Sequence, residues 1–329
     1  MNNKVVLLHN KISENPTVDE LDVLEQAEIV EKSLVELGYS TERVAFSFDI
    51  ADAINKLSEI KPAFVFNLFE GLENDGQLIN MAPTILDYLK IPYTGCTKEA
   101  IFLTSDKVIT KKILAAHNIP TLEWVTIDDE EDNTFVEGER YILKAVWEDA
   151  SICLEEDSVV LPESKEHLIT LIKNQNNKYK KEFFAEKYLH GTDISTPLLA
   201  DKILPSRKLL YNNHPEERVR VAGYKAKWEK DTEEYINTTI TFDLSESEKS
   251  FMKRIEEISL DCRKKFGLTG YSRVDFRVDK QGNPFVLEIN PNPCISDDSL
   301  YYDSLEIAGI PYTEAIREII KDIHYIYNL

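Results

Sequence analysis

Four polar side chains near the C-terminal end of the chain have a spacing that suits cation binding. They are Arg273, Asp275, Glu288 and Asn290. Residues 271–278 and 284–290 have the alternating, β-branched and aromatic pattern of strands, and residues 280–283 (KQGN) are typical of a turn. If Asp279 pairs with Pro284, the two carboxylates lie directly opposite each other, and the two-residue period of a strand places all four side chains on one face.

Two carboxylates that face each other across a ladder repel, at a cost of about 0.2–1 kcal/mol. A bound cation reverses the sign of that interaction, and oxygen ligands from Asp, Glu and Asn suit a hard cation such as Mg²⁺. The pattern therefore predicts a metal site on a hairpin. An ordinary solvated hairpin face is the alternative, and a register slip of one residue would separate the four side chains.

Size and charge exclude several classes of protein. The 329 residues are enough for two or three domains, and 43% hydrophobic and 29% charged residues are ordinary for a soluble globular chain. Lys and Arg number 38 against 59 Asp and Glu, which gives a formal net charge of −21. This acidity argues against nucleic acid or an anionic membrane as the main partner, because both attract a cationic surface. We interpret the acidic run at residues 128–132 as a solvated loop.

Cysteine spacing and hydropathy exclude further classes of protein. The cysteines are Cys96, Cys153, Cys262 and Cys294, and no two form a C-x-x-C sequence, so neither a disulfide scaffold nor a zinc module is indicated. The N-terminus has only four consecutive apolar residues, too few for a signal peptide. No apolar run approaches the roughly 18 residues of a membrane span. We therefore expect a cytoplasmic protein.

The first hundred residues alternate between strands and helices. Strands are expected at residues 4–8, 43–48 and 63–67, and helices at 21–37, 52–60 and 78–89. This βαβ pattern predicts a parallel sheet covered by helices. No G-x-G-x-x-G follows the first strand and the chain has no Walker A sequence, so a dinucleotide-binding oxidoreductase and a P-loop NTPase are poor fits.

The rest of the chain has an α+β pattern. We expect helices at residues 105–117, with a cap at Thr104 or Ser105, and at 165–173, 246–266 and 312–325. Strands are expected at 141–144, 151–154 and 183–189, and between 192 and 241 the chain is rich in strands. The sequence thus predicts three domains, at residues 1–104, 105–191 and 192–329.

A site that holds a cation and two carboxylates commonly holds phosphate as well, and phosphate needs cationic or N–H donors. The candidates are Lys107, Lys144 and Lys227, although each lysine alone is also consistent with a surface charge. The apolar strand expected at 183–189 could wall an adenine ring, and Asp193 could take ribose hydroxyls. Residues 148–151 form a short polar segment between two expected apolar strands, which could also contribute to this site. An ordinary hairpin turn is the alternative interpretation of this segment.

Taken in order, these segments resemble the ATP-grasp superfamily, and within it the D-alanine–D-alanine ligase family. The matching segments are VFN (65–67), NDG (74–76), IPYTGC (91–96), SDK (105–107), YILK (141–144), EKYLHGTD (186–193), KAKW (225–228), residues 271–299 and GIPY (309–312). The resemblance spans residue 63 or so to the C-terminus. It implies an ATP-grasp fold of mixed α/β and α+β class, with an N-terminal parallel-sheet domain and the nucleotide between the central and C-terminal domains.

The resemblance also implies roles for the residues at matching positions. The implied nucleotide contacts are Lys107, Lys144, Ser151, Glu186, Lys187, Tyr188, Leu189, Asp193 and Leu287. Two Mg²⁺ ions, with Mn²⁺ as an alternative, would be ligated by Asp275, Glu288 and Asn290. Arg273 and the backbone N–H of Cys294 would stabilise an oxyanion, and Lys227 and Ser299 would hold the carboxylate of the acceptor.

The implied reaction joins a carboxylate to an amine. The carboxylate attacks the γ-phosphate of ATP to give an acyl phosphate and ADP, and the amine then attacks the acyl carbon through a tetrahedral oxyanion. Metal ions that bridge phosphates neutralise charge in such a transfer. The implied partners are amino-acid or peptide substrates and a second copy of the chain in a homodimer.

Departures from the family pattern concentrate on the substrate side. Residues 9–13 (HNKIS) lack the glycine-rich turn of the family, and Glu70 stands where the family has histidine. The family's serine, two glycines and tyrosine are replaced by Ala150, Cys153, Cys294 and Trp228. We therefore predict a ligase with an altered carboxyl substrate. The open alternatives are a true D-alanine–D-alanine ligase, a nucleotide-binding module without ligase activity, a kinase-like phosphotransferase, and a Cys294 that acts through its thiol.

Overall fold

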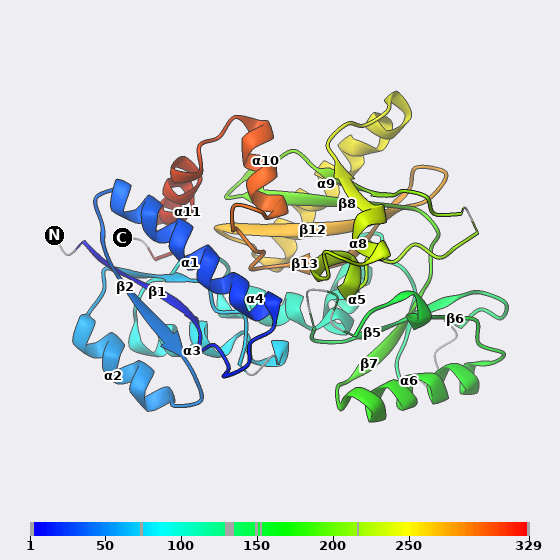
Figure 1. Cartoon of the computed structure of the whole chain (residues 1–329), viewed down its shortest axis with the longest axis horizontal. Helices are drawn as coiled ribbons and strands as arrows, with labels where there is room; N and C mark the ends of the chain where they lie inside the picture. The colour runs from blue at the N-terminus through cyan, green and yellow to red at the C-terminus, as the bar shows by residue number, and fades with distance from the viewer. Residues whose placement is uncertain are drawn as a thin grey trace.

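The chain folds around three separate β-sheets (Figure 1). The computed structural model describes residues 3–72, 75–128, 135–148, 151, 153–215 and 217–327. One sheet is parallel and the other two are antiparallel, which confirms the predicted mixture of α/β and α+β architecture. Asn74, Ala150 and most of the acidic run at 128–132 lie outside the described residues. The domain limits at residues 104 and 191 stay a prediction.

The N-terminal sheet is parallel, with the strand order β2-β1-β3. Its elements are β1 (Lys4–Asn10), α1 (Val18–Glu36), β2 (Ser40–Phe46), α2 (Ile50–Ile60), β3 (Phe64–Asn67), a 3-10 turn (Gly76–Leu78) and α3 (Met81–Leu89). One face packs against α1 and the C-terminal helix α11 (Tyr312–Tyr327), and the other packs against α2 and α3. Because both faces are covered, β1 is a continuous apolar run and does not alternate.

Two consecutive helices lead from this sheet to the next. They are α4 (Lys98–Ser105), which we did not predict, and α5 (Lys107–Ala116). Asp106 separates them, and its carboxylate accepts hydrogen bonds from the backbone N–H groups of Val108 (2.8 Å) and Ile109 (2.9 Å). The predicted cap at Thr104 or Ser105 is therefore wrong, because both residues already belong to α4 and only Asp106 has extended backbone.

The central sheet is antiparallel, with the strand order β4-β7-β5-β6 and with α6 (Lys165–Tyr179) packed on one face. Its strands are β4 (Trp124–Val125), β5 (Tyr141–Ala145), β6 (Val159–Val160), which follows a 3-10 turn (Glu156–Ser158), and β7 (Phe183–Lys187). The predicted strand at 151–154 is wrong. Ser151 and Cys153 have φ angles of 62° and 60°, which belong to the left-handed region and cannot continue a strand.

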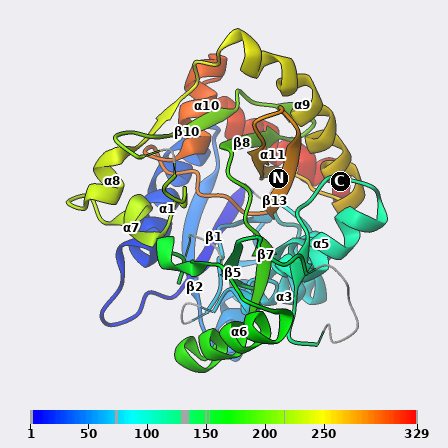
Figure 2. The ribbon, with the colours of Figure 1, turned by 90° about the vertical axis from the view of Figure 1, so that its right-hand side faces the viewer.

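The C-terminal sheet has the strand order β11-β10-β8-β12-β13 and contains the predicted hairpin. Its elements are β8 (Thr192–Leu199), β9 (Lys202–Ile203), β10 (Arg207–Tyr211), α7 (Tyr224–Trp228), α8 (Glu233–Asn237), β11 (Thr238–Thr241), α9 (Glu246–Phe266), β12 (Tyr271–Val278), β13 (Pro284–Asn290) and α10 (Leu300–Ala308). Helix α9 has the predicted limits, since a capping box begins it and Gly267 ends it. Figure 2 shows α9 and β8 in the upper part of the molecule and α6 in the lower part.

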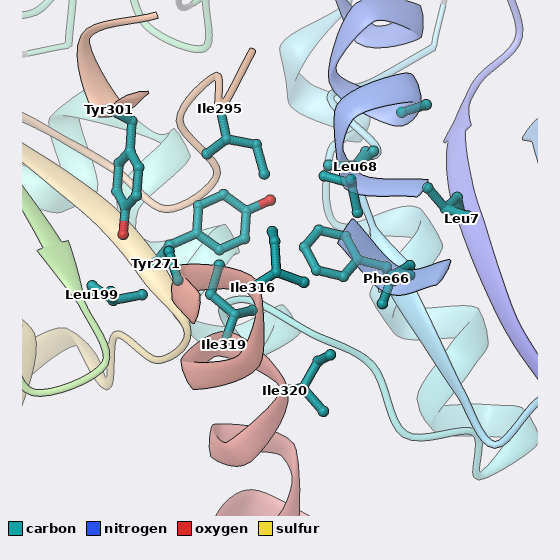
Figure 3. Close-up of a cluster of buried hydrophobic side chains, with 14 of the residues drawn as sticks. Leu7, Phe66, Leu68, Leu199, Tyr271, Ile295, Tyr301, Ile316, Ile319 and Ile320 are labelled. Carbon is teal, nitrogen blue, oxygen red and sulfur yellow. The ribbon is translucent and has the colours of Figure 1, made fainter. Parts of the chain in front are cut away.

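Tyr271, the first residue of β12, anchors the hairpin in the core of the N-terminal sheet. Its ring stacks on Phe66 of β3 with centroids 6.4 Å apart. Figure 3 shows Tyr271 near Ile295, Ile316 and Phe66, which come from three distant parts of the sequence. The Tyr271 hydroxyl donates to Asn292 Oδ1 at 2.6 Å. The hairpin and the loop that follows it are thus held against the N-terminal sheet.

Two glycines permit a close approach of backbones beside this anchor. Gly270 has a φ of +64°, and a Cβ built on it would lie 2.8 Å from Gly95 Cα. The Thr269 hydroxyl donates to Gly95 O at 2.8 Å across the same contact. Gly270 is therefore needed for packing, because a side chain on it would push the two segments apart, whereas Gly95 of the IPYTG segment needs glycine for its φ of +86°.

Within the part of the chain that the structure describes, no helix combines the length and the apolarity that crossing a membrane requires.

The packing of α11 on the N-terminal sheet predicts a stability effect. Ile319 is 1% exposed in this core. We expect Ile319→Ala to lower the free energy of unfolding by about 2–5 kcal/mol, because it leaves a cavity in this core. Ile307→Ala is the matched control, since Ile307 is 59% exposed and its loss should change stability by less than about 0.5 kcal/mol. Urea unfolding followed by circular dichroism measures both, and equal losses would contradict the packing.

Candidate active site

The predicted pairing of the hairpin is correct at the site and wrong at the turn. Asp275 lies opposite Glu288 as predicted, and Arg273 opposite Asn290. The turn differs, because Val278 and not Asp279 pairs with Pro284. A register shift between Asp275 and Phe276 leaves Leu287 unpaired, as in a β-bulge. This shift offsets the difference at the turn, so that Asp275 and Glu288 are paired as predicted. The bulge thus brings the two carboxylates opposite each other.

Each of the two carboxylates has a cation beside it. Arg273 Nε donates to both oxygens of Asp275 at 3.0 Å, and Arg273 Nη2 lies 3.8 Å from Glu288 Oε1. Lys107 Nζ lies 3.8 Å from Glu288 Oε2. Burial alone would raise the pKa of Glu288, but Lys107, Lys227 and Arg273 lower it to about 2. Glu288 is therefore ionised at neutral pH, as a metal ligand must be.

The oxygen donors on this face fit a hard cation. The predicted ligands are two carboxylates and the Asn290 amide, whose Oδ1 accepts a hydrogen bond from Asn292 N at 2.9 Å. That bond orients the amide and leaves a second lone pair on the oxygen for an ion. Sulfur and imidazole ligands are missing from the predicted set, which favours Mg²⁺ or Mn²⁺ over zinc.

The upstream lysines reach the site from the central sheet and from α5. Lys107, in the first turn of α5, is 6% exposed and donates from Nζ to Glu148 O at 2.6 Å. Lys144 of β5 donates to Glu186 Oε2. Lys227 of α7 is close enough to lower the pKa of Glu288. The three predicted lysines thus converge on the hairpin from three separate elements.

The segment predicted to contact the adenosine follows β7. The Glu186 side chain is buried. The Tyr188 hydroxyl accepts a hydrogen bond from Arg220 N at 2.7 Å. The Lys187 side chain points to Glu139, with Nζ 3.4 Å from a carboxylate oxygen, so its predicted nucleotide contact is left to its backbone. Leu189 and Leu287 are partly buried.

Asp193, the predicted ribose ligand, already has two protein partners. Arg277 Nε lies 2.7 Å from Asp193 Oδ1, and the Tyr211 hydroxyl donates to Oδ2 at 2.7 Å. A carboxylate offers about four lone-pair sites, so two are left for ribose hydroxyls. Arg277 and Tyr211 orient this carboxylate, and the sequence alone did not show either residue as part of the site.

The segment that contains Ser151, an implied nucleotide contact, lies against the segment before α7. The Ser151 hydroxyl donates to Ala222 O at 2.8 Å, and Tyr224 N donates to Leu154 O at 3.1 Å. Gly223 has no room for a Cβ, which would lie 2.5 Å from Leu154 O. Cys153 keeps the left-handed φ that suits the glycine of the family pattern. The two segments therefore close on each other beside Lys227.

The end of the site that the family pattern predicts to hold substrate is lined by acids and an amide. Gln26 of α1 donates from Nε2 to Glu70 Oε1 and to Asp22 Oδ2, both at 3.0 Å. Its Oε1 accepts from Ile295 N at 3.3 Å. Burial raises the pKa of the Asp22 carboxyl. Gln26 thus connects α1 to Glu70 and to the loop after β13. The sequence analysis predicted neither Asp22 nor Gln26 as part of the site.

Cys294 and Ser299 lie in the loop that follows the hairpin. Cys294 Sγ is 2.9 Å from Ser296 Oγ, and Ser296 Oγ donates to Asp298 Oδ1 at 2.8 Å. Burial, and then the charge of Asp22, raise the pKa of the Cys294 thiol well above its usual value, which makes the thiol a poor nucleophile. Ser299 Oγ accepts from Tyr302 N at 3.2 Å and begins α10.

Arg207 of β10 is a further charged residue beside the predicted metal ligands that the sequence did not indicate. It lies opposite Ser195 of β8, which in turn lies opposite Asp275. Its Nε is buried and has no hydrogen-bond partner among the described residues. Burial and then Arg273 lower the pKa of Arg207 to about 10. Only the pairing of distant strands brings Arg207 here, so spacing could not reveal it.

Comparisons with known proteins show which family this chain is similar to. A model of the family described as "D-ala D-ala ligase C-terminus" matches residues 140–321. A D-alanine–D-alanine ligase of Aquifex aeolicus is 29% identical over 90% of this chain and 94% of its own length. One of Clostridium botulinum (strain Loch Maree) is 31% identical over 72% of this chain and 74% of its own length.

Solved structures show the same fold. The crystal structure of D-alanine–D-alanine ligase from Bacillus anthracis complexed with ATP aligns with a TM-score of 0.74 and 23% identity, over 99% of this chain and 98% of that one. The ligase from Coxiella burnetii aligns with a TM-score of 0.71 and 18% identity, over 99% and 95%. The chain therefore belongs to the D-alanine–D-alanine ligase family of ATP-grasp enzymes, which are ATP-dependent ligases that join a carboxylate to an amine.

Proposed function

We propose that this ligase activates the carboxylate of an amino acid or peptide other than D-alanine and joins it to the amine of a second amino acid or peptide. The observation that carries the proposal is the hydrogen bond from Gln26 to Glu70. It holds a carboxylate at the substrate end, where the family pattern has histidine. An acid accepts hydrogen bonds that a neutral histidine would donate, so this end favours a substrate with a different set of donors.

The phosphate end of the site follows the family. Lys107 and Lys144 would bind phosphate oxygens, and Asp275, Glu288 and Asn290 would ligate two Mg²⁺ or Mn²⁺ ions. When bound, the ions would neutralise the charge that develops on the transferring phosphoryl group. The low pKa of Glu288 supports this role, because the carboxylate needs no deprotonation before it binds an ion.

Arg273 would stabilise the oxyanion of the second step. Its two hydrogen bonds to Asp275 preset the direction of the guanidinium group, so little reorganisation is needed as charge develops. Cys294 would add its backbone N–H, and its protonated thiol takes no part. Lys227 and Ser299 would hold the acceptor's carboxylate, since the Ser299 hydroxyl accepts the cap bond and still has its own proton to donate.

A true D-alanine–D-alanine ligase is the second candidate. The names of the Aquifex and Clostridium relatives favour it, because both carry that activity in their names. The two candidates share the phosphate end of the site and differ only at the end lined by Asp22, Gln26 and Glu70. Assembly as a homodimer and a cytoplasmic location remain predictions.

The metal ligands can be tested one at a time. We expect Asp275→Asn and Glu288→Gln each to reduce ADP formation by roughly 10²-fold, because each removes a charged ligand from the ions. Glu256→Gln is the control, since Glu256 is an exposed carboxylate of α9. A coupled ADP-release assay over a Mg²⁺ titration measures all three. Unchanged ADP formation in both site variants would show that the hairpin is not the metal site.

A substrate panel separates the two candidates. We expect ADP release with D-alanine alone to be weak, and stronger release when other amino acids or dipeptides supply the carboxylate, because Glu70 alters the hydrogen bonds on offer. Glu70→His restores the family residue and should shift the preference toward D-alanine. Strong turnover with D-alanine and with no other compound would contradict the proposal that the carboxylate substrate is not D-alanine.

The role of Arg273 distinguishes a ligase from a kinase-like phosphotransferase. With hydroxylamine as the trapping reagent, an acyl phosphate gives a hydroxamate. We expect Arg273→Met to slow amide formation by about 10²–10³-fold, which is typical for loss of one oxyanion donor. Arg273→Lys keeps a charge and should lose less. If the wild-type enzyme gives a stable phosphorylated product and no hydroxamate, the ligase chemistry is wrong.

A further inference from the structure

Lys111 of α5 is a buried ammonium group to which the proposed mechanism gives no part. It lies one helical turn after Lys107, and its side chain is 1% exposed. Its Nζ donates to Thr121 Oγ1 at 2.9 Å and to Leu122 O at 3.2 Å, and it lies 5.8 Å from the centre of the Trp124 ring. Its charged partner is Glu186 Oε1, with which it forms an ion pair.

Glu186 therefore lies between two ammonium groups. Lys111 pairs with one carboxylate oxygen and Lys144 with the other. Burial alone raises the pKa of Glu186, and the two lysines reverse this, so the net shift is downward. Arg277 of β12 is the further charged group that interacts with Glu186 from a neighbouring element. The carboxylate is thus ionised in a place where an unpaired carboxylate would take up a proton.

The two lysines differ in their exposure to solvent. The Lys111 side chain is 1% exposed and is held by Thr121 and Leu122, whereas the Lys144 side chain is 15% exposed. Lys144 is also near enough to Glu288 of the metal face to lower its pKa. A phosphate group bound at the predicted nucleotide site would therefore compete with Glu186 for Lys144 and not for Lys111.

We propose that Lys111 is a positioning residue that keeps Glu186 ionised and oriented when the Lys144 ammonium moves from Glu186 to a nucleotide phosphate. The inference rests on the proposed nucleotide site. After that exchange, Lys111 is the one of these two lysines that still pairs with Glu186. The oxygen that Lys144 releases becomes a hydrogen-bond acceptor at the adenine end of the site.

An ionised Glu186 also selects the base. The exocyclic amino group of adenine donates to a carboxylate, whereas the carbonyl of guanine at the same position presents a second acceptor and repels it. A protonated Glu186 would donate and would lose that distinction. The buried ammonium of Lys111 therefore determines both the affinity for ATP and the preference for ATP over GTP.

Lys111 has a second connection, which defines the competing explanation. The Thr121 hydroxyl donates to Val286 O of β13 at 2.9 Å, and Val286 N donates to Pro120 O at 2.8 Å. Through Thr121, Lys111 contacts the strand that carries Glu288. Loss of Lys111 could thus act on the hairpin and not on Glu186, and the experiment must separate the two routes.

The test measures nucleotide binding to the full chain by calorimetry, with ATP and with GTP, between pH 5.5 and pH 8.5. In Lys111→Met we expect ATP to bind at least about tenfold more weakly, and the ratio of ATP to GTP affinity to fall by a similar factor. Without Lys111 the pKa of Glu186 rises when Lys144 leaves, so ATP binding should weaken as the pH falls. The wild-type protein should show no such loss over this range.

Two further variants make the result specific. Thr121→Val breaks the connection to β13 and keeps the charge on Glu186, so it should leave the pH profile and the ATP to GTP ratio unchanged. In a Glu186→Gln background, Lys111→Met should have no additional pH effect, because no carboxylate is left to protonate. Lys111→Gln keeps polar contacts to Thr121 and Leu122, and it serves as a second test if Lys111→Met does not fold.

The outcomes are distinct. If Lys111→Met and Lys111→Gln bind ATP and GTP as the wild type does at every pH, the inference is overturned and the nucleotide site stands. If Thr121→Val reproduces the effect of Lys111→Met, the route through β13 is the cause and the inference is again overturned. Wild-type protein that binds no ATP would overturn the proposed function together with this inference.

Discussion

The repulsion between Asp275 and Glu288 is the constraint on which the rest of the site depends. Two carboxylates that lie opposite each other on one face of a hairpin destabilise it unless cations compensate. The chain supplies those cations itself, from Arg273 on the same face and from Lys107 on α5. The site therefore carries its own counter-charges, with the guanidinium and ammonium groups directed toward the two carboxylates.

This balance requires elements from all parts of the chain to meet at one hairpin. Tyr271 holds the start of β12 in the core of the N-terminal sheet, and Pro120 holds β13 through Val286 N. The central sheet contributes Lys144 and Glu186 from neighbouring strands, since Lys144 pairs with Phe184 in the register of β5 and β7. Figure 1 shows β12 and β13 between the strands of the N-terminal and central sheets. The hairpin therefore connects the sheets as well as carrying the predicted metal ligands.

Much of this was predictable, because it depends on local patterns. The period of two in residues 271–278 and 284–290 predicted the strands and the face that carries the carboxylates. The predicted turn was wrong by one residue and the site pairing was still correct, because a bulge at Leu287 made up the difference. A bulge adds one residue without changing the hydrophobic pattern at either end, so the pattern could not show it. The strand expected at 151–154 failed for a similar reason, since left-handed backbone at Ser151 and Cys153 carries no glycine signal.

By itself the sequence determined the types of residue that can do this chemistry, the strands and helices that carry most of them, and the family. Those features depend on side-chain type and on spacing along one element, which are local. Only the tertiary structure decided that Arg207 lies beside the predicted metal ligands, that Gln26 holds Glu70, and that Lys111 pairs with Glu186. Each of these contacts joins residues far apart in sequence, and no local periodicity constrains which distant groups meet when separate sheets pack. The substrate end of the site is formed by such contacts, which is why its chemistry was the part that the sequence left most open.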